Sequence, residues 1–181
     1  MKVLKTLAML ALLALMAACA QPARLDAMKV TAIPDVVVPD GFFLRKAILI
    51  NNVHGGEPTN PLWTSQVGNV EFRAALESSL EGFGLLAPPS AGTYDLTATL
   101  IKLDQPLMGI DMTVTTSANY LLKNRATNAE ALNRTITLPY TATFGSALLG
   151  VERLRVANEG SIKTNLEQLI RDLLSLQPPA P

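Results

Sequence analysis

Three stretches in the second half of the chain alternate strictly between apolar residues and polar residues, most of which are threonine. They cover 94–100, 112–122 and 135–144. Alternation with a period of two is typical of strands that bury one face and leave the other in water, so it predicts an antiparallel sheet. Pro139 cannot donate to a ladder, which places the third strand at an edge. The predicted buried face consists of Tyr94, Leu96, Ala98, Leu100, Met112, Val114, Thr116, Ala118, Tyr120, Leu122, Ile136, Leu138, Tyr140, Ala142 and Phe144.

Other apolar patterns add one strand and two helices. A short run rich in isoleucine and valine, Lys46–Val53, predicts a strand buried on both faces and therefore central in the sheet. Apolar residues at helical spacing predict a helix over 67–83 that ends at Gly84. A second helix is predicted over 147–176. It should break near 158–161, because Gly160 would destabilise a helix interior by about 1 kcal/mol relative to alanine.

Together these elements predict an α+β fold of order β-α-β-β-β-α. The sheet is expected to be antiparallel or mixed and four-stranded, with two helices on one face. The domain should span 46–176 and be followed by a disordered tail at 177–181. Residues 19–45 contain several prolines and predict a lipidated N-terminus and tether, with 20–32 as a linker.

The first residues of the chain have the pattern of a secretory signal. Residues 1–18 contain two lysines, an apolar run and a pair of alanines, and Cys19 follows directly. The segment Leu15–Cys19 resembles the lipobox of bacterial lipoproteins, in which the cysteine receives a diacylglyceryl group and becomes the first residue. An ordinary signal peptide cut elsewhere would instead leave Cys19 as a free thiol. Cys19 is the only cysteine, so no disulfide competes for it.

This resemblance implies a membrane anchor at Cys19 and predicts a location. Acyl chains hold a protein on a bilayer while its folded part stays in water. In Gram-negative lipoproteins an aspartate after the cysteine commonly signals retention in the inner membrane, whereas here Ala20 and Gln21 follow. We therefore expect the periplasmic face of the outer membrane.

Charge and residue usage narrow the function classes. The sequence contains 15 basic and 15 acidic residues, and Lys2 and Lys5 would leave with the signal. A slightly acidic mature chain does not favour nucleic acid as a partner, and none is expected. His54 is the only histidine, so neither a metal site nor a cofactor is expected.

The lipobox and the order of elements resemble the small outer-membrane lipoproteins of the YajG type. The lipopolysaccharide-assembly lipoprotein LptE and the auxiliary lipoproteins of lipid-transport ABC systems are more distantly similar in fold. Residues 60–68, 138–144 and 150–160 resemble segments of an uncharacterised family of Gram-negative lipoproteins. The resemblance carries no catalytic motif, so it implies a protein that is not an enzyme.

Few side chains suggest chemistry. His54-Gly55-Gly56 is interpreted as a turn, because no nucleophile motif accompanies it. Glu152, Arg153, Arg155 and Glu159 form a charge cluster that predicts either a solvated helix face or a partner contact. Trp63 lies in a polar loop, where it would cover the core or anchor an interface.

Two classes of function remain open. The favoured one is a non-enzymatic binding or assembly module of the cell envelope, with an envelope protein as partner. Its expected contact surface is the threonine-rich face of the sheet, represented by Thr113, Thr115 and Thr137, or the loop that carries Trp63. The alternative is a hydrolase or acyltransferase acting on envelope glycans or lipids, for which Glu57 and Asp104 are the candidate carboxylates.

Overall fold

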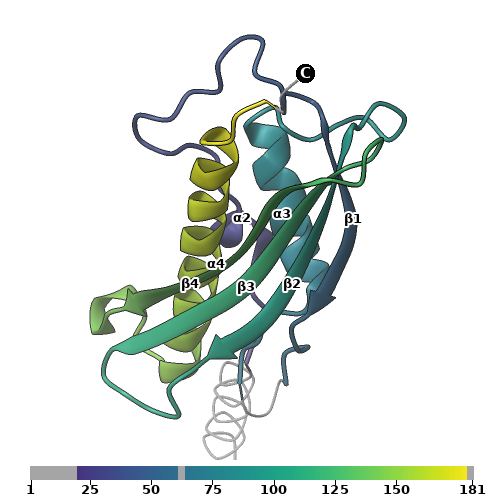
Figure 1. Cartoon of the computed structure of the whole chain (residues 1–181). Coiled ribbons are helices and arrows are strands. Elements are labelled where there is room, and N and C mark those ends of the chain that lie inside the picture. The colour runs from purple at the N-terminus through teal and green to yellow at the C-terminus, as the bar shows by residue number, and fades with distance from the viewer. Residues whose placement is uncertain (1–19, 61–63, 179–181) are drawn as a thin grey trace, which may run out of the picture.

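Figure 1 presents a computed structural model of the chain, which describes residues 20–60 and 64–178. The signal peptide, Cys19 and Trp63 lie outside the described residues. The elements, in chain order, are α2 (Leu25–Met28), β1 (Ile48–Gly55), α3 (Asn69–Gly82), β2 (Tyr94–Asp104), β3 (Met112–Asn124), β4 (Glu130–Ala142), a short 3₁₀ turn (Phe144–Ser146) and α4 (Gly150–Leu174).

The four strands form one mixed sheet in the order β1-β2-β3-β4. β1 runs parallel to β2, and the other neighbouring pairs are antiparallel. The helices all lie on one face of this sheet (Figure 1), which confirms the predicted α+β class and the order of the main elements. The prediction that the last strand lies at an edge is also confirmed, since β4 has β3 as its only neighbour in the sheet.

The prediction that the first strand is central is wrong, because β1 forms the other edge. Its apolar character has a different cause. The segment that follows α3 covers its outer side: the Ile48 N–H donates to the Leu85 carbonyl at 3.1 Å, and the Ile48 carbonyl accepts from the Ala87 N–H at 2.8 Å. The Arg73 guanidinium also donates to the Asn51 carbonyl at 3.1 Å. Backbone groups at the outer edge of β1 are therefore already hydrogen-bonded to other segments of the same chain.

The predicted assignment of buried and exposed residues is confirmed on β2 and β3 and confirmed in part on β4. From Tyr94 to Leu100 and from Met112 to Leu122 every second residue is buried, as the alternation predicts. On β4 Ile136 and Ala142 are buried, but Tyr140 keeps 37% of its surface exposed. Phe144 lies beyond the strand and is 53% exposed. The core therefore lies under β2 and β3, where α3 and α4 meet the sheet.

The C-terminal helix is continuous from Gly150 to Leu174, so the predicted break near 158–161 is wrong. Gly160 has a packing role instead. A β-carbon at this position would fall inside van der Waals contact of the Tyr140 ring. The helix tolerates the glycine because the missing side chain lets α4 lie close against β4.

The N-terminal segment belongs to the domain, which corrects the predicted tether. Met28, Val30, Ile33 and Leu44 are buried in the same apolar cluster as α3, α4 and the sheet. The buried Val30 N–H donates to the Ser79 hydroxyl at 2.9 Å. Burial of these apolar side chains stabilises the segment in place, although its prolines prevent a long helix or strand.

A buried polar network attaches α4 to the sheet. The Asn165 side chain accepts the Tyr120 hydroxyl proton at 2.8 Å and donates to the Ile136 carbonyl at 2.9 Å. Thr116 and Ser161 share a hydroxyl–hydroxyl bond of 2.7 Å. Burial raises the pKa of the Tyr120 phenol, which therefore stays a hydrogen-bond donor. Among the described helices, none has the length and apolar character needed to cross a bilayer.

Candidate functional site

The face of the sheet opposite the helices carries no other element of the described chain (Figure 1). Thr113 and Thr137 are exposed on this face, and Thr115 is half-buried. These are the threonines that the alternation predicts there. We call the outward side of β3 and β4 the open face. It runs from Thr113 to Leu121 on β3 and from Asn133 to Thr141 on β4. Its residues are Thr113, Thr115, Ser117, Asn119, Leu121, Asn133, Thr135, Thr137, Pro139 and Thr141. Lys123 and Glu130 follow beyond it, at the end that contains the β3–β4 turn.

Hydroxyl and amide groups on the open face bond to each other across the strands. The Thr113 and Thr141 hydroxyls lie 2.9 Å apart, as do those of Ser117 and Thr137. The Asn119 amide donates to the Thr135 hydroxyl at 3.2 Å. Such cross-strand pairs stabilise the sheet and satisfy part of the hydrogen-bonding capacity of the surface. A partner that covers this face therefore displaces fewer strongly bound waters than it would from a charged face.

Charged side chains surround the open face as ion pairs. On β2, Lys102 and Asp104 pair at 2.8 Å beside the middle of β3. At the end of the sheet that contains the β3–β4 turn, Lys123 and Glu130 approach to 3.7 Å. The open face itself contains no charged residue. Its surroundings are nearly neutral as well, because each cation has an acidic neighbour.

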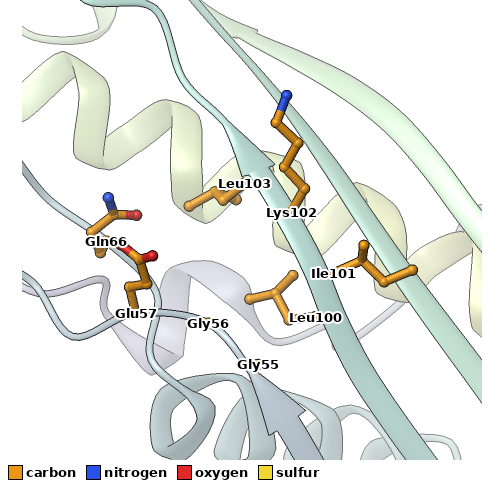
Figure 2. Close-up of a pocket in the computed structure, with 8 residues that line it drawn as sticks. All are labelled: Gly55, Gly56, Glu57, Gln66, Leu100, Ile101, Lys102 and Leu103. Carbon is orange, nitrogen blue, oxygen red and sulfur yellow. The ribbon is translucent and has the colours of Figure 1, made fainter.

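A cavity of about 350 Å³ lies where β1 ends beside β2 (Figure 2). Glu57 and Gln66 form one wall, and the Lys102 amine points away from them. Asp104, the second carboxylate nominated for an enzyme, does not line this cavity and is paired with Lys102. The arrangement does not bring the two carboxylates together at the cavity. Within 20–60 and 64–178, no group of three or more histidine, cysteine, aspartate or glutamate residues could hold a metal ion.

The His54-Gly55-Gly56 segment differs from its predicted role in one respect. His54 is the exposed penultimate residue of β1 and lies opposite Thr99. The turn begins after it, at Gly55 and Gly56, which have φ angles of 75° and 74°. Glycine adopts this left-handed conformation without strain. At Gly55 a β-carbon would also collide with the Leu100 carbonyl, so the glycine allows β1 to approach β2 at its end.

The charge cluster at the start of α4 is neither a solvated face nor a free contact surface. Arg153 and Glu159 are only 5% and 2% exposed. The Glu159 carboxylate accepts three hydrogen bonds from Arg24: from its backbone N–H at 2.9 Å, Nε at 3.0 Å and Nη2 at 2.9 Å. Arg155 Nε lies 3.8 Å from the same carboxylate. This ion pair raises the pKa of Arg24 through the hydrogen bond and the charge of Glu159. It also attaches the N-terminal segment to α4.

Two exposed apolar loops were not recognised from the sequence. Leu107, Met108 and Ile110 are 101%, 84% and 77% exposed in the β2–β3 loop. Leu148 and Leu149 are 82% and 53% exposed between β4 and α4. Leu148 and Leu149 fall within the helix predicted over 147–176, whereas α4 begins only at Gly150. In the β2–β3 loop the sequence signal is the presence of large apolar residues between two predicted strands, where polar residues are usual.

Solved structures share this fold. Protein XCC0632 from Xanthomonas campestris, of the DUF330 family, matches with a TM-score of 0.60 and 13% identity, over 85% of this chain and 94% of that chain. A candidate lipoprotein from Caulobacter crescentus CB15 matches with a TM-score of 0.48 and 13% identity, over 70% and 88%. A minor lipoprotein from Acinetobacter baumannii matches with 0.46 and 12%, over 74% and 98%.

At these identities the likeness concerns the fold alone. The chain has the α+β fold of XCC0632, and proteins described as lipoproteins occur among its structural neighbours. No family model matches the sequence. No curated protein matches it significantly either.

Proposed function

We propose that this chain is a non-enzymatic lipoprotein of the YajG type, anchored through Cys19 to the periplasmic face of the outer membrane. Its open face binds another envelope protein. The observation that carries this proposal is the uncharged open face of a sheet whose other face packs against the helices. The structural neighbours described as lipoproteins agree with the envelope location.

The chemistry of the open face suits a protein contact. Solvated sheet faces usually include lysine and glutamate, whereas this one presents methyl groups and hydroxyls that are already paired across the strands. Depletion of charge is the compositional signal of an interface centre. Among the described strands β4 has a neighbour on one side alone, so a partner strand can add to the sheet at its other side.

A charge-insertion experiment tests the open face. Lysines at Thr113, Thr115 and Thr137 should abolish crosslinking to the partner in intact envelopes, because three charges would have to be desolvated on contact. The melting temperature should change little, since all three side chains point away from the core. Retention of every wild-type crosslink by a folded triple variant would place the contact elsewhere, and the loop that contains Trp63 is the next candidate.

A matched control adds the same charge away from the sheet. Ser90, Ala126 and Gln177 are exposed outside the open face. Lysines at these positions should leave the crosslinks intact, which separates a local effect from the effect of net charge.

Replacement of Cys19 tests the anchor separately. Cys19→Ser should abolish labelling by an alkyne fatty acid and leave unprocessed precursor or a soluble periplasmic form. Unchanged labelling and unchanged outer-membrane fractionation would show that Cys19 is not the site of lipidation.

A further inference from the structure

We propose that the two exposed apolar loops form a membrane-docking surface, which inserts into the lipid headgroup region beside the anchor and sets the orientation of the domain. We call this the docking end. It consists of the β2–β3 loop, with Leu107, Met108 and Ile110, and the β4–α4 connection, with Phe144, Leu148 and Leu149. The proposal rests on the lipid anchor proposed for Cys19.

The distance between the anchor and the folded domain is the first argument. The fold begins directly after Cys19: Ala20 is only 4% exposed and Ala23 only 6%. Consecutive Cα atoms lie about 3.8 Å apart, so no slack separates a lipid on Cys19 from the packed chain. The end of the domain at which residue 20 lies must therefore stand against the bilayer surface.

The location of the apolar loops is the second argument. In Figure 1 the purple start of the described chain enters at the lower end of the molecule, where the β2–β3 loop also lies. The β4–α4 connection joins this loop through printed contacts. The Phe144 N–H donates to the Asp111 carboxylate at 2.9 Å, and Arg153 Nη2 donates to the Gly109 carbonyl at 3.4 Å. The start of the described chain and the apolar side chains thus lie at the same end.

The loops have a rigid base, which is the third argument. Arg153 is 5% exposed, and its guanidinium carbon lies 5.2 Å from the centre of the Phe144 ring. Its Nη1 donates to the Ala147 carbonyl at 2.6 Å. This buried arginine connects both loops from beneath, while their leucine, methionine and isoleucine side chains point outward. A preorganised base lowers the entropy lost when the side chains enter another phase.

The residues of the docking end fit a lipid surface. Exposed leucine, isoleucine and methionine lose contact with water when they enter the acyl boundary, and an aromatic ring is favourable at headgroup depth. Asp111 is the only charged residue in 105–111 and 143–149, and its carboxylate accepts the Phe144 N–H. Few charges therefore have to be desolvated on insertion. A single lipid anchor would leave the domain free to rotate, whereas two apolar loops beside it would fix one orientation.

A depth measurement on the full lipidated chain tests the proposal. A thioether on Cys19 blocks its thiol, so one introduced cysteine is the only free thiol and can carry the fluorophore NBD. Met108→Cys and Leu148→Cys place the probe at the docking end. Ala126→Cys places it in the β3–β4 turn, at the other end of β3. The proteins are reconstituted in phosphatidylethanolamine–phosphatidylglycerol vesicles that contain nitroxide-labelled lipid.

At positions 108 and 148 the emission should shift to the blue and be quenched by the nitroxide lipid, whereas at position 126 it should remain that of a probe in water. Adding Leu107→Glu and Leu149→Glu should remove the shift at 108 and 148 but leave flotation with the vesicles unchanged.

The possible failures are distinguishable. If the wild-type protein floats with the vesicles but all three probes report water, the docking end does not insert and this proposal is wrong, while the anchor stands. That outcome would include the case in which the loops bind a protein, since none is present. If the wild-type protein does not float, the anchor and the docking proposal both fail.

Discussion

Removing the Arg24 side chain should destabilise the whole domain, although Arg24 lies in a segment that the sequence predicts to be a tether. Two of the three hydrogen bonds that Glu159 accepts come from this side chain. In Arg24→Ala they are lost, and a carboxylate that is 3% exposed keeps the backbone N–H of residue 24 and the more distant Arg155. The perturbation therefore leaves a buried charge poorly compensated.

The magnitude follows from this geometry. Breaking a buried ion pair by removing one partner costs about 3–5 kcal/mol. The Arg24 side chain is 55% exposed, so water can reach the vacated space, and Arg155 still attracts the carboxylate. Both effects lower the expected loss to about 2–3 kcal/mol of unfolding free energy. For a domain of this size the melting temperature should fall by roughly 4–12 °C.

Urea titration and thermal unfolding followed by circular dichroism give both quantities. Arg45→Ala is the matched control, because Asp40, its partner at 3.3 Å, is fully exposed, and the change should stay within about 0.5 kcal/mol. Arg24→Ala combined with Glu159→Gln should be more stable than Arg24→Ala alone, since no buried carboxylate at position 159 is then left without its Arg24 partner. If Arg24→Ala is no more destabilising than Arg45→Ala, the N-terminal segment does not contribute to the fold as described.

Three further predictions concern the core. Val114→Asp should lower the unfolding free energy by about 4 kcal/mol or prevent folding, whereas Thr115→Asp should be mild; equal effects in urea titration would mean that the strand register is wrong. Gly160→Ala should lower the unfolding free energy, although alanine has the higher helix propensity, because its β-carbon would collide with the Tyr140 ring. In a Tyr140→Ala background the same change should raise the unfolding free energy. If Gly160→Ala raises it in the wild-type background, the close packing of α4 on Tyr140 is excluded. An unfolded tyrosine loses its proton near pH 10, whereas burial raises the pKa of Tyr120 in the folded chain. The stability of the wild type should therefore fall more steeply above about pH 10 than that of Tyr120→Phe. Equal slopes of melting temperature against pH in the two proteins would contradict this.

The alternating strands could be predicted from the sequence because a period of two specifies both the element and its buried face. β2 and β3 follow this rule along most of their length, and the open face with Thr113, Thr115 and Thr137 follows from the same pattern. β1 could not be placed in the same way. Its outer edge is covered by the segment from Leu85 to Ala87, which makes an edge strand as apolar as a central one.

The errors at the two ends of the domain arise from contacts between residues distant in sequence. From the sequence alone Gly160 indicates a helix break. The fold shows that the glycine is needed instead because the Tyr140 ring lies against it. In sequence the charged cluster at the start of α4 is typical of a solvated helix face. The partner of its buried Glu159 is Arg24, which lies 135 positions earlier in the chain. Neither contact produces a periodic pattern, so local sequence rules cannot detect it.

The exposed apolar loops illustrate the same limit for function. Leu107, Met108 and Ile110 lie between the strands predicted over 94–100 and 112–122, where no periodic pattern indicates whether an apolar side chain is buried or exposed. Only the fold shows that they are exposed and joined to Leu148 and Leu149 through Arg153. A surface that forms only when two loops come together cannot be predicted from the sequence pattern of either loop alone.

Site-specific photocrosslinking in intact cells tests the proposed function most directly. A benzophenone side chain at Thr115 or Thr137 lies on the open face, and the same group at the exposed Arg171 lies on the helical side. We predict that a defined envelope protein becomes crosslinked from Thr115 and Thr137 but not from Arg171. Crosslinks from Arg171 alone, or none from the open face in cells where the wild-type anchor is intact, would contradict the proposal that this face binds the partner.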